Sequence, residues 1–255
     1  MFVWLIVALA GLLLQQPETM SLLGQPLFAP KLPKAARESA DAELARAHAA
    51  YTAKPSGVAE VLALARAHAA LGRIGDALII LTHGVEANPD ASELLLARGN
   101  GYIVIRKFEV AARDLSKASA KLPEARCSLG FAQYLAGDYE RARTTYKDCS
   151  NAGVFGYLAE RRAGGTPARR PVPDGPVPSS SSPIRFPGTV AKEKVAAEPI
   201  AATYLTAIEA LLDGKKDDAS ERLKTILERS RDDWMQPAYI AAEADYAKLT
   251  ARARR

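Results

Sequence analysis

Apolar residues recur every three to four positions along most of the chain from residue 34 onward, which predicts amphipathic helices. The first such stretch, residues 34–53, ends before Pro55-Ser56-Gly57. Ala, Leu, Arg, Glu and Lys dominate these stretches, and such residues lose little side-chain freedom in a helix. We therefore expect an all-α fold.

The helical pattern also repeats itself after 34 residues. The matched pairs are Ala65/Gly99, His68/Tyr102, Gly72/Arg106, Ile74/Phe108, Ala77/Ala111, Leu81/Leu115, Gly84/Ala118 and Pro89/Pro123. A third unit follows the same order with Gly130, Gly137, Tyr139, Ala142, Tyr146 and Cys149. Small residues at fixed positions let two antiparallel helices approach closely, while large apolar residues fill the seam between them. The pattern therefore predicts consecutive helix hairpins.

Residues 57 to about 150 resemble the tetratricopeptide repeat family, whose members share this period and this order of small, aromatic and Pro positions. The resemblance implies a helix-hairpin solenoid. The sequence departs from the family pattern at Arg106, where Gly is usual, and at His68 and Gly84. The stretches SLLGQPLFAP, GDYERA and DWMQPAYIAAEADYAKL are similar to a group of bacterial, signal-bearing tetratricopeptide proteins, a likeness that implies no defined activity.

Composition divides the chain into five parts. They are a signal peptide or membrane anchor (1–19), an extended lead-in (20–33), an N-terminal helical-repeat array (34–163), a disordered Pro/Ser/Gly linker (164–195), and a repeat-like hairpin with a capping helix (196–255). The linker is expected because its Pro, Gly and Ser residues cannot bury enough apolar surface to order themselves. Whether the last part continues the first superhelix or forms a separate block stays open.

The first fourteen residues, MFVWLIVALAGLLL, are uninterruptedly apolar. This length suits a signal-peptide core better than a bilayer crossing, which needs about 20 residues. No Lys or Arg precedes the run, and no small-x-small cleavage site follows it. We expect an exported, periplasmic protein or one tethered to the membrane through residues 2–14. The alternative is a cytoplasmic protein whose true start is Met20.

Charge and reactive residues favour a binding protein over an enzyme. The net charge is +5, and much of the excess lies in the Arg pairs 161–162 and 169–170 and at the C-terminus. The three His residues, at positions 48, 68 and 83, form no ligand pair at helical spacing. Hydrolase elbow, zinc-helix and phosphate-loop motifs are missing from the sequence. We therefore expect no catalytic site, no cofactor and no metal.

A solenoid of this kind binds partners along the first helix of each hairpin. The face that points away from the seam carries Leu62, Arg66, Glu93, Leu96, Asn100, Ile103, Phe131 and Tyr134. This groove is largely apolar and suits an extended or helical peptide. Its occupant could instead be part of the same chain: the lead-in at Leu22-Leu23, the linker or the C-terminal helices.

Cys127 and Cys149 fall on opposite helices of the third hairpin. In an exported protein they could form a disulfide. The alternative is a pair of buried thiols.

These observations predict a non-catalytic scaffold or adaptor at the cell envelope that binds a protein or peptide, with no nucleic acid expected. The alternative is a helical-repeat protein that binds nucleic acid or an anionic membrane surface through its basic segments. The identity of the partner and the oligomeric state stay open.

Overall fold

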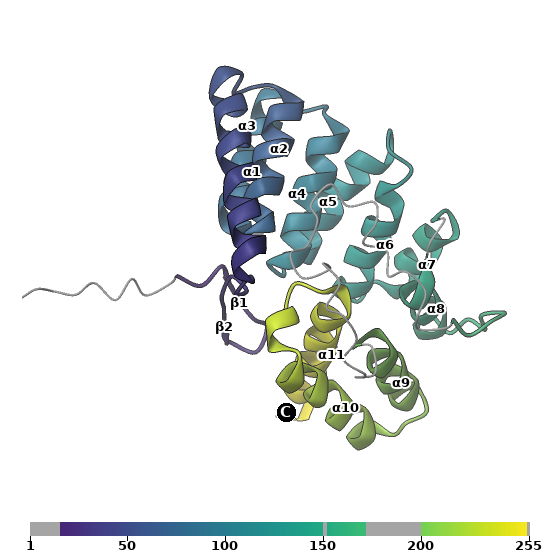
Figure 1. The fold of residues 1–255 in the computed structure, drawn as a ribbon. Helices are drawn as coiled ribbons and strands as arrows, with labels where there is room; N and C mark the ends of the chain where they lie inside the picture. The colour runs from purple at the N-terminus through teal and green to yellow at the C-terminus, as the bar shows by residue number, and fades with distance from the viewer. Residues whose placement is uncertain (1–15, 150–151, 172–199, 254–255) are drawn as a thin grey trace, which may run out of the picture.

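The computed structural model describes residues 16–149, 152–171 and 200–253, and these form an all-α protein with one short β-hairpin (Figure 1). The helices of the first part are α1 (Lys34–Ala53), α2 (Val58–Ala70), α3 (Ile74–Ala87), α4 (Ser92–Val104), α5 (Phe108–Ser119), α6 (Ala125–Ala136), α7 (Tyr139–Lys147) and α8 (Gly153–Arg162). Those of the last part are α9 (Ile200–Leu212), α10 (Lys216–Arg229), the 3₁₀ turn η1 (Arg231–Asp233) and α11 (Pro237–Ala253). The expected all-α class is confirmed. The apolar run 1–14 and most of the expected linker lie outside the described residues.

Four helix pairs form hairpins with the same turn. Each turn has one residue with positive φ: Gly72 (74°), Arg106 (64°), Gly137 (89°) and Gly214 (80°). In each case the next residue donates its backbone N–H to the carbonyl five positions earlier, as Lys107 does to Tyr102 at 2.8 Å. This is the Schellman motif, which satisfies the last carbonyls of a helix. The predicted spacing of the turns is therefore present in the structure.

Small residues bring the two helices of a hairpin together, as the sequence pattern predicts. A Cβ at Gly99 would lie 2.6 Å from Cγ of Leu115, and one at Gly130 would lie 3.1 Å from the ring of Tyr146. Leu115 and Tyr146 are buried in the same core cluster. The seam therefore depends on the absence of a side chain at these two glycines.

The helices pack mainly against their neighbours in sequence, so the chain builds a stack of hairpins (Figure 1). α9 packs against α8, and α9 and α10 form a further hairpin against which α11 packs. The C-terminal part thus continues the stack through α8 and α9. Its last helix, α11, then folds back toward α4 and α5.

The lead-in is extended but also forms a hairpin that the sequence pattern did not predict. Strand β1 (Thr19–Met20) pairs antiparallel with β2 (Pro26–Leu27), with Thr19 opposite Leu27. Leu27 is buried in the main core. The segment that follows lies against the first hairpin turn, because a Cβ at Gly72 would be 2.6 Å from Cδ of Pro30.

Candidate functional site

The turn between α4 and α5 holds a buried ion pair at its centre. Arg106 is the one residue other than Gly with positive φ among those described. Its Nη2 lies 2.7 Å from Oε2 of Glu243 on α11, and the two side chains are only 2% and 1% exposed. Nη2 also donates to the carbonyl of Trp234 at 3.0 Å, and the guanidinium lies 5.4 Å from the centre of that indole ring. Arg106 therefore fastens the C-terminal part to the array.

The N-terminal hairpin joins the same cluster. The backbone N–H of Leu22 donates to Oε1 of Glu243 at 2.5 Å. Nε1 of Trp234 donates to the carbonyl of Phe28 at 2.8 Å. Glu243 thus accepts hydrogen bonds from two segments that are far apart in the sequence. The carboxylate of Glu243 on α11 therefore joins the N-terminal hairpin to the α4–α5 turn.

A second buried pair holds α8 to α11. Arg162 donates to both carboxylate oxygens of Asp245, at 2.8 and 2.7 Å. The hydroxyl of Tyr204 donates to Oδ2 of Asp245 at 2.6 Å, so the hydroxyl of Tyr134, 2.8 Å from that of Tyr204, is the donor in their contact. Burial raises the pKa of both tyrosines well above the usual value. Both phenols therefore keep their protons at neutral pH and can fill these donor roles.

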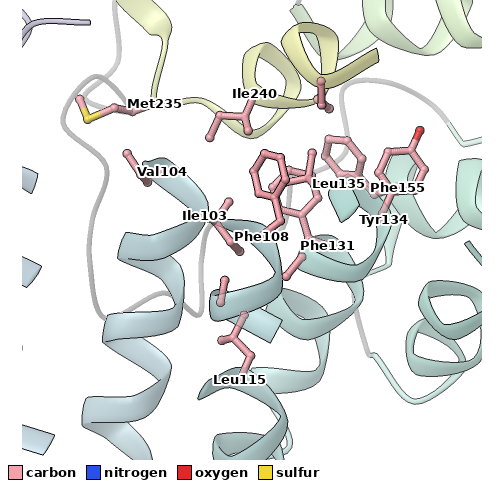
Figure 2. Close-up of a cluster of buried hydrophobic side chains, with 14 of the residues drawn as sticks. Ile103, Val104, Phe108, Leu115, Phe131, Tyr134, Leu135, Phe155, Met235 and Ile240 are labelled. Atoms are coloured by element: carbon pink, nitrogen blue, oxygen red, sulfur yellow. The ribbon is translucent and has the colours of Figure 1, made fainter. Parts of the chain in front are cut away.

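Apolar contacts complete the closure. Figure 2 shows Met235 and Ile240 above the ends of α4, α5 and α6, where Val104, Phe108 and Leu135 lie. All five belong to one core cluster. Burial of this cluster contributes about 25 cal/mol for each Å² of apolar surface removed from water. The C-terminal part is therefore packed into the same core as the array.

The predicted groove is largely covered by the chain itself. Six of the eight predicted groove residues are buried: Leu62, Leu96, Asn100, Ile103, Phe131 and Tyr134. Arg66 and Glu93 are exposed. Of the occupants that the sequence left open for the surface at Phe131 and Tyr134, the chain itself supplies contacts there, from α8 and α9. Phe155 of α8 lies 4.5 Å from the ring of Phe131, centre to centre.

A disulfide joins Cys127 of α6 to Cys149, which follows α7. Their Cα atoms are 5.1 Å apart, within the range that a disulfide requires. The bond closes the third hairpin at the end opposite its Schellman turn. Of the two alternatives that the sequence left open, the structure has the bridged form.

A hollow of about 690 Å³ lies between the end of the array and the C-terminal helices. Its buried wall is the Arg162–Asp245 pair, and its apolar part is formed by Leu211, Leu212 and Leu249. Lys216 and Asp217 at the start of α10 and Lys248 of α11 add charged groups, and Lys248 also donates to the carbonyl of Leu135 at 3.1 Å. Leu212 is 38% exposed, whereas most large aliphatic side chains of the described residues are less exposed than this. We call this hollow the C-terminal cleft.

Metal ligands do not gather in the described part of the chain, where no group of three or more His, Cys, Asp or Glu side chains could hold an ion. His68 has Nδ1 3.3 Å from a carboxylate oxygen of Asp76. Burial lowers the pKa of His68, so the imidazole is neutral at pH 7 and the contact is no ion pair at that pH. His68 acts as a packing residue, at the position that Tyr102 takes in the next hairpin.

Sequence reasoning did not find Arg162, Trp234, Glu243 or Asp245 as a set. One signal of a buried contact was present in the sequence: Arg106 stands at the turn position where the family pattern has Gly. A second was the pair of carboxylates in the Ala-rich stretch YIAAEADYA, since acidic residues on a helix face that is otherwise apolar call for partners.

Comparison with known proteins gives no further guide, because no protein-family model and no curated protein matches the sequence. Among the helices of the described residues, none has the length and apolar character needed to cross a bilayer.

Proposed function

We propose that the protein is a non-catalytic scaffold of the tetratricopeptide type, acting at the cell envelope, and that it binds a peptide segment of a partner protein in the C-terminal cleft. The observation that carries the proposal is the cleft itself: an aliphatic patch beside two lysines and Asp217, open to solvent at Leu212. The four equivalent Schellman turns support the assignment to the repeat class.

The cleft has the chemistry of a peptide site. Binding pockets are mostly apolar, with a few polar groups that fix orientation. Leu211, Leu212 and Leu249 would contact an aliphatic side chain of the partner, while the exposed Lys216 would attract a neighbouring carboxylate. We therefore expect the recognised segment to combine an aliphatic residue with an acidic side chain or a free C-terminus.

The alternative function, binding of nucleic acid or an anionic surface through basic segments, gains less support. Three of the four arginines in the predicted pairs face carboxylates of the same chain. Arg162 pairs with Asp245, Arg170 pairs with Glu209 at 2.8 Å, and Arg161 lies 3.9 Å from Asp213. An arginine that is paired with a carboxylate of the same chain contributes less to the binding of phosphate groups.

Selection of a random peptide library on the full chain tests the proposal, with affinities of the selected peptides measured by fluorescence anisotropy. Peptides with an aliphatic residue next to an acidic group are expected. Lys216→Glu should weaken their binding about tenfold or more, since one charge-assisted hydrogen bond contributes about 1.5–3 kcal/mol. Leu212→Asp should also weaken binding.

Ile79→Asp is the matched control, because Ile79 is an exposed aliphatic residue on α3, at 58% exposure. It should bind as the unchanged protein does. Equal affinity of the Lys216→Glu, Leu212→Asp and Ile79→Asp proteins for every selected peptide would remove the cleft from the proposal. Phe131 and Tyr134 are unsuitable probes, because both are buried.

A further inference from the structure

Exposed large apolar side chains are concentrated in the N-terminal hairpin. Those found on the described surface are Met20, Leu22, Leu23, Phe28, Ile79 and Leu212. Four of the six fall within residues 20–28. Scattered exposed leucines need no explanation, but a cluster of this kind marks a contact surface.

The cluster forms one face of the hairpin. Ser21 and Leu27 are buried, while the residues on either side of each, Met20 and Leu22, and Pro26 and Phe28, are exposed. Successive side chains of an extended strand point to opposite faces. The inner face therefore packs on the protein, and the exposed side is mainly apolar, with Gln25 as its polar side chain.

The hairpin is held firmly in this orientation. Its tip is bonded to Glu243 through the N–H of Leu22, and its end to Trp234 through the carbonyl of Phe28. At its start, Oε2 of Glu18 accepts a hydrogen bond from the N–H of Gly75 at 3.1 Å. Burial raises the pKa of Glu18. The outer face is thus a built surface, anchored at three points.

We propose that this outer face lies on the surface of a lipid bilayer that also receives the apolar run 1–14. The run ends at Leu14, six residues before Met20. Six residues span at most about 20 Å, so a bilayer that holds the run lies within reach of the hairpin. Lys31 follows closely in the sequence, and Lys34 and Arg37 come next, in ion pairs within α1 with Glu38 at 3.9 Å and Asp41 at 3.7 Å. Apolar residues flanked by basic ones are typical of segments that lie in a membrane interface.

The size of the face favours lipid over a protein partner. A stable protein interface takes about 20–30 residues on each side, many more than this hairpin offers. A small apolar contact suffices when a neighbouring segment already tethers the chain, because the tether gives a high effective concentration. This inference concerns a different surface from the C-terminal cleft and does not depend on the proposed function.

Site-specific quenching on the full chain in phosphatidylcholine vesicles tests the proposal. Both native cysteines are in the disulfide, so a single introduced cysteine can be labelled selectively with an environment-sensitive fluorophore. The test position is Leu23→Cys, and the control is Ser116→Cys, an exposed residue of α5. The label at position 23 should be quenched by spin-labelled lipid and shielded from aqueous iodide. The label at position 116 should show the reverse.

Two results would overturn the proposal. Accessibility to iodide at position 23 equal to that at position 116 would show that the face meets water. Shielding from iodide without quenching by spin-labelled lipid would show that protein covers it, either a second copy or the chain's own apolar run. Adding phosphatidylglycerol to the vesicles should increase lipid quenching at position 23, because Lys31 follows the hairpin closely in the sequence.

Discussion

At the scale of single residues, Arg106 combines an unfavourable backbone conformation with an ion pair to a residue far away in the sequence, Glu243. A residue other than Gly in the left-handed region is disfavoured by about 1–2 kcal/mol. The three equivalent turns avoid this cost with Gly72, Gly137 and Gly214. Arg106 has this backbone cost, and from its position in the turn the guanidinium contacts Glu243.

Replacing Arg106 by Gly should therefore relax the turn and still destabilise the protein. Removing one member of a buried ion pair costs about 3–5 kcal/mol, which exceeds the about 1–2 kcal/mol gained in backbone strain. The free energy of unfolding, measured by urea denaturation, should fall by about 1–4 kcal/mol. Adding Glu243→Gln should recover part of the loss, since a neutral amide still accepts the N–H of Leu22. An Arg106→Gly protein as stable as the unchanged one would contradict this role.

His68 should make stability depend on pH. Burial lowers its pKa from the ordinary value of 6.5. The folded state then binds fewer protons than the unfolded state between the lowered pKa and 6.5, so the free energy of unfolding falls as pH drops through that window.

His68→Tyr, which copies Tyr102 of the next hairpin, should flatten the pH profile below pH 6.5. His83→Tyr changes an exposed histidine and should leave the profile as it is. Urea midpoints measured at a series of pH values, for both variants and for the unchanged protein, test this prediction. Parallel profiles for the unchanged protein and His68→Tyr would refute the assignment.

At the scale of elements, most of the correct predictions came from the spacing of apolar residues and from the 34-residue repeat. It predicted the helix over residues 34–53, the turns at Gly72, Arg106 and Gly137, and the close approach at Gly99. These features depend on residues near one another in the sequence or on a fixed period. The β-hairpin escaped prediction, because its pairing depends on Leu27 reaching the core and on bonds to Glu243 and Trp234, more than 200 residues away.

The disulfide should stabilise the third hairpin, whose second helix, α7, has only nine residues. It closes a loop with a sequence separation of 22, for which chain entropy predicts about 3 kcal/mol. Reduction should lower Tm, and the Cys127→Ala, Cys149→Ala protein should have the lower Tm with or without reductant. Alkylation of both thiols in unreduced protein would show that the bond is not formed.

At the scale of the whole molecule, the C-terminal part changes what the repeat pattern implies. The repeat pattern alone indicates a groove on α2, α4 and α6, whereas α8 and α9 contact Phe131 and Tyr134, two of the residues predicted to line it. No periodicity could reveal this, since Arg106–Glu243 and Arg162–Asp245 join residues 137 and 83 positions apart. The C-terminal cleft could not be predicted from the sequence, because α9, α10 and α11 form it only after the chain has folded.

The central claim is that the N-terminal hairpin, the α4–α5 turn and α11 close together on Glu243. Hydrogen exchange with mass spectrometry, comparing the full chain with its Glu243→Lys variant, tests this claim most directly. The variant places two positive charges side by side in the core. Amides of residues 21–27, 103–108 and 237–248 should lose protection together, while those of α2 and α3 keep theirs. Loss confined to α11, with the hairpin and the α4–α5 turn still protected, would contradict it.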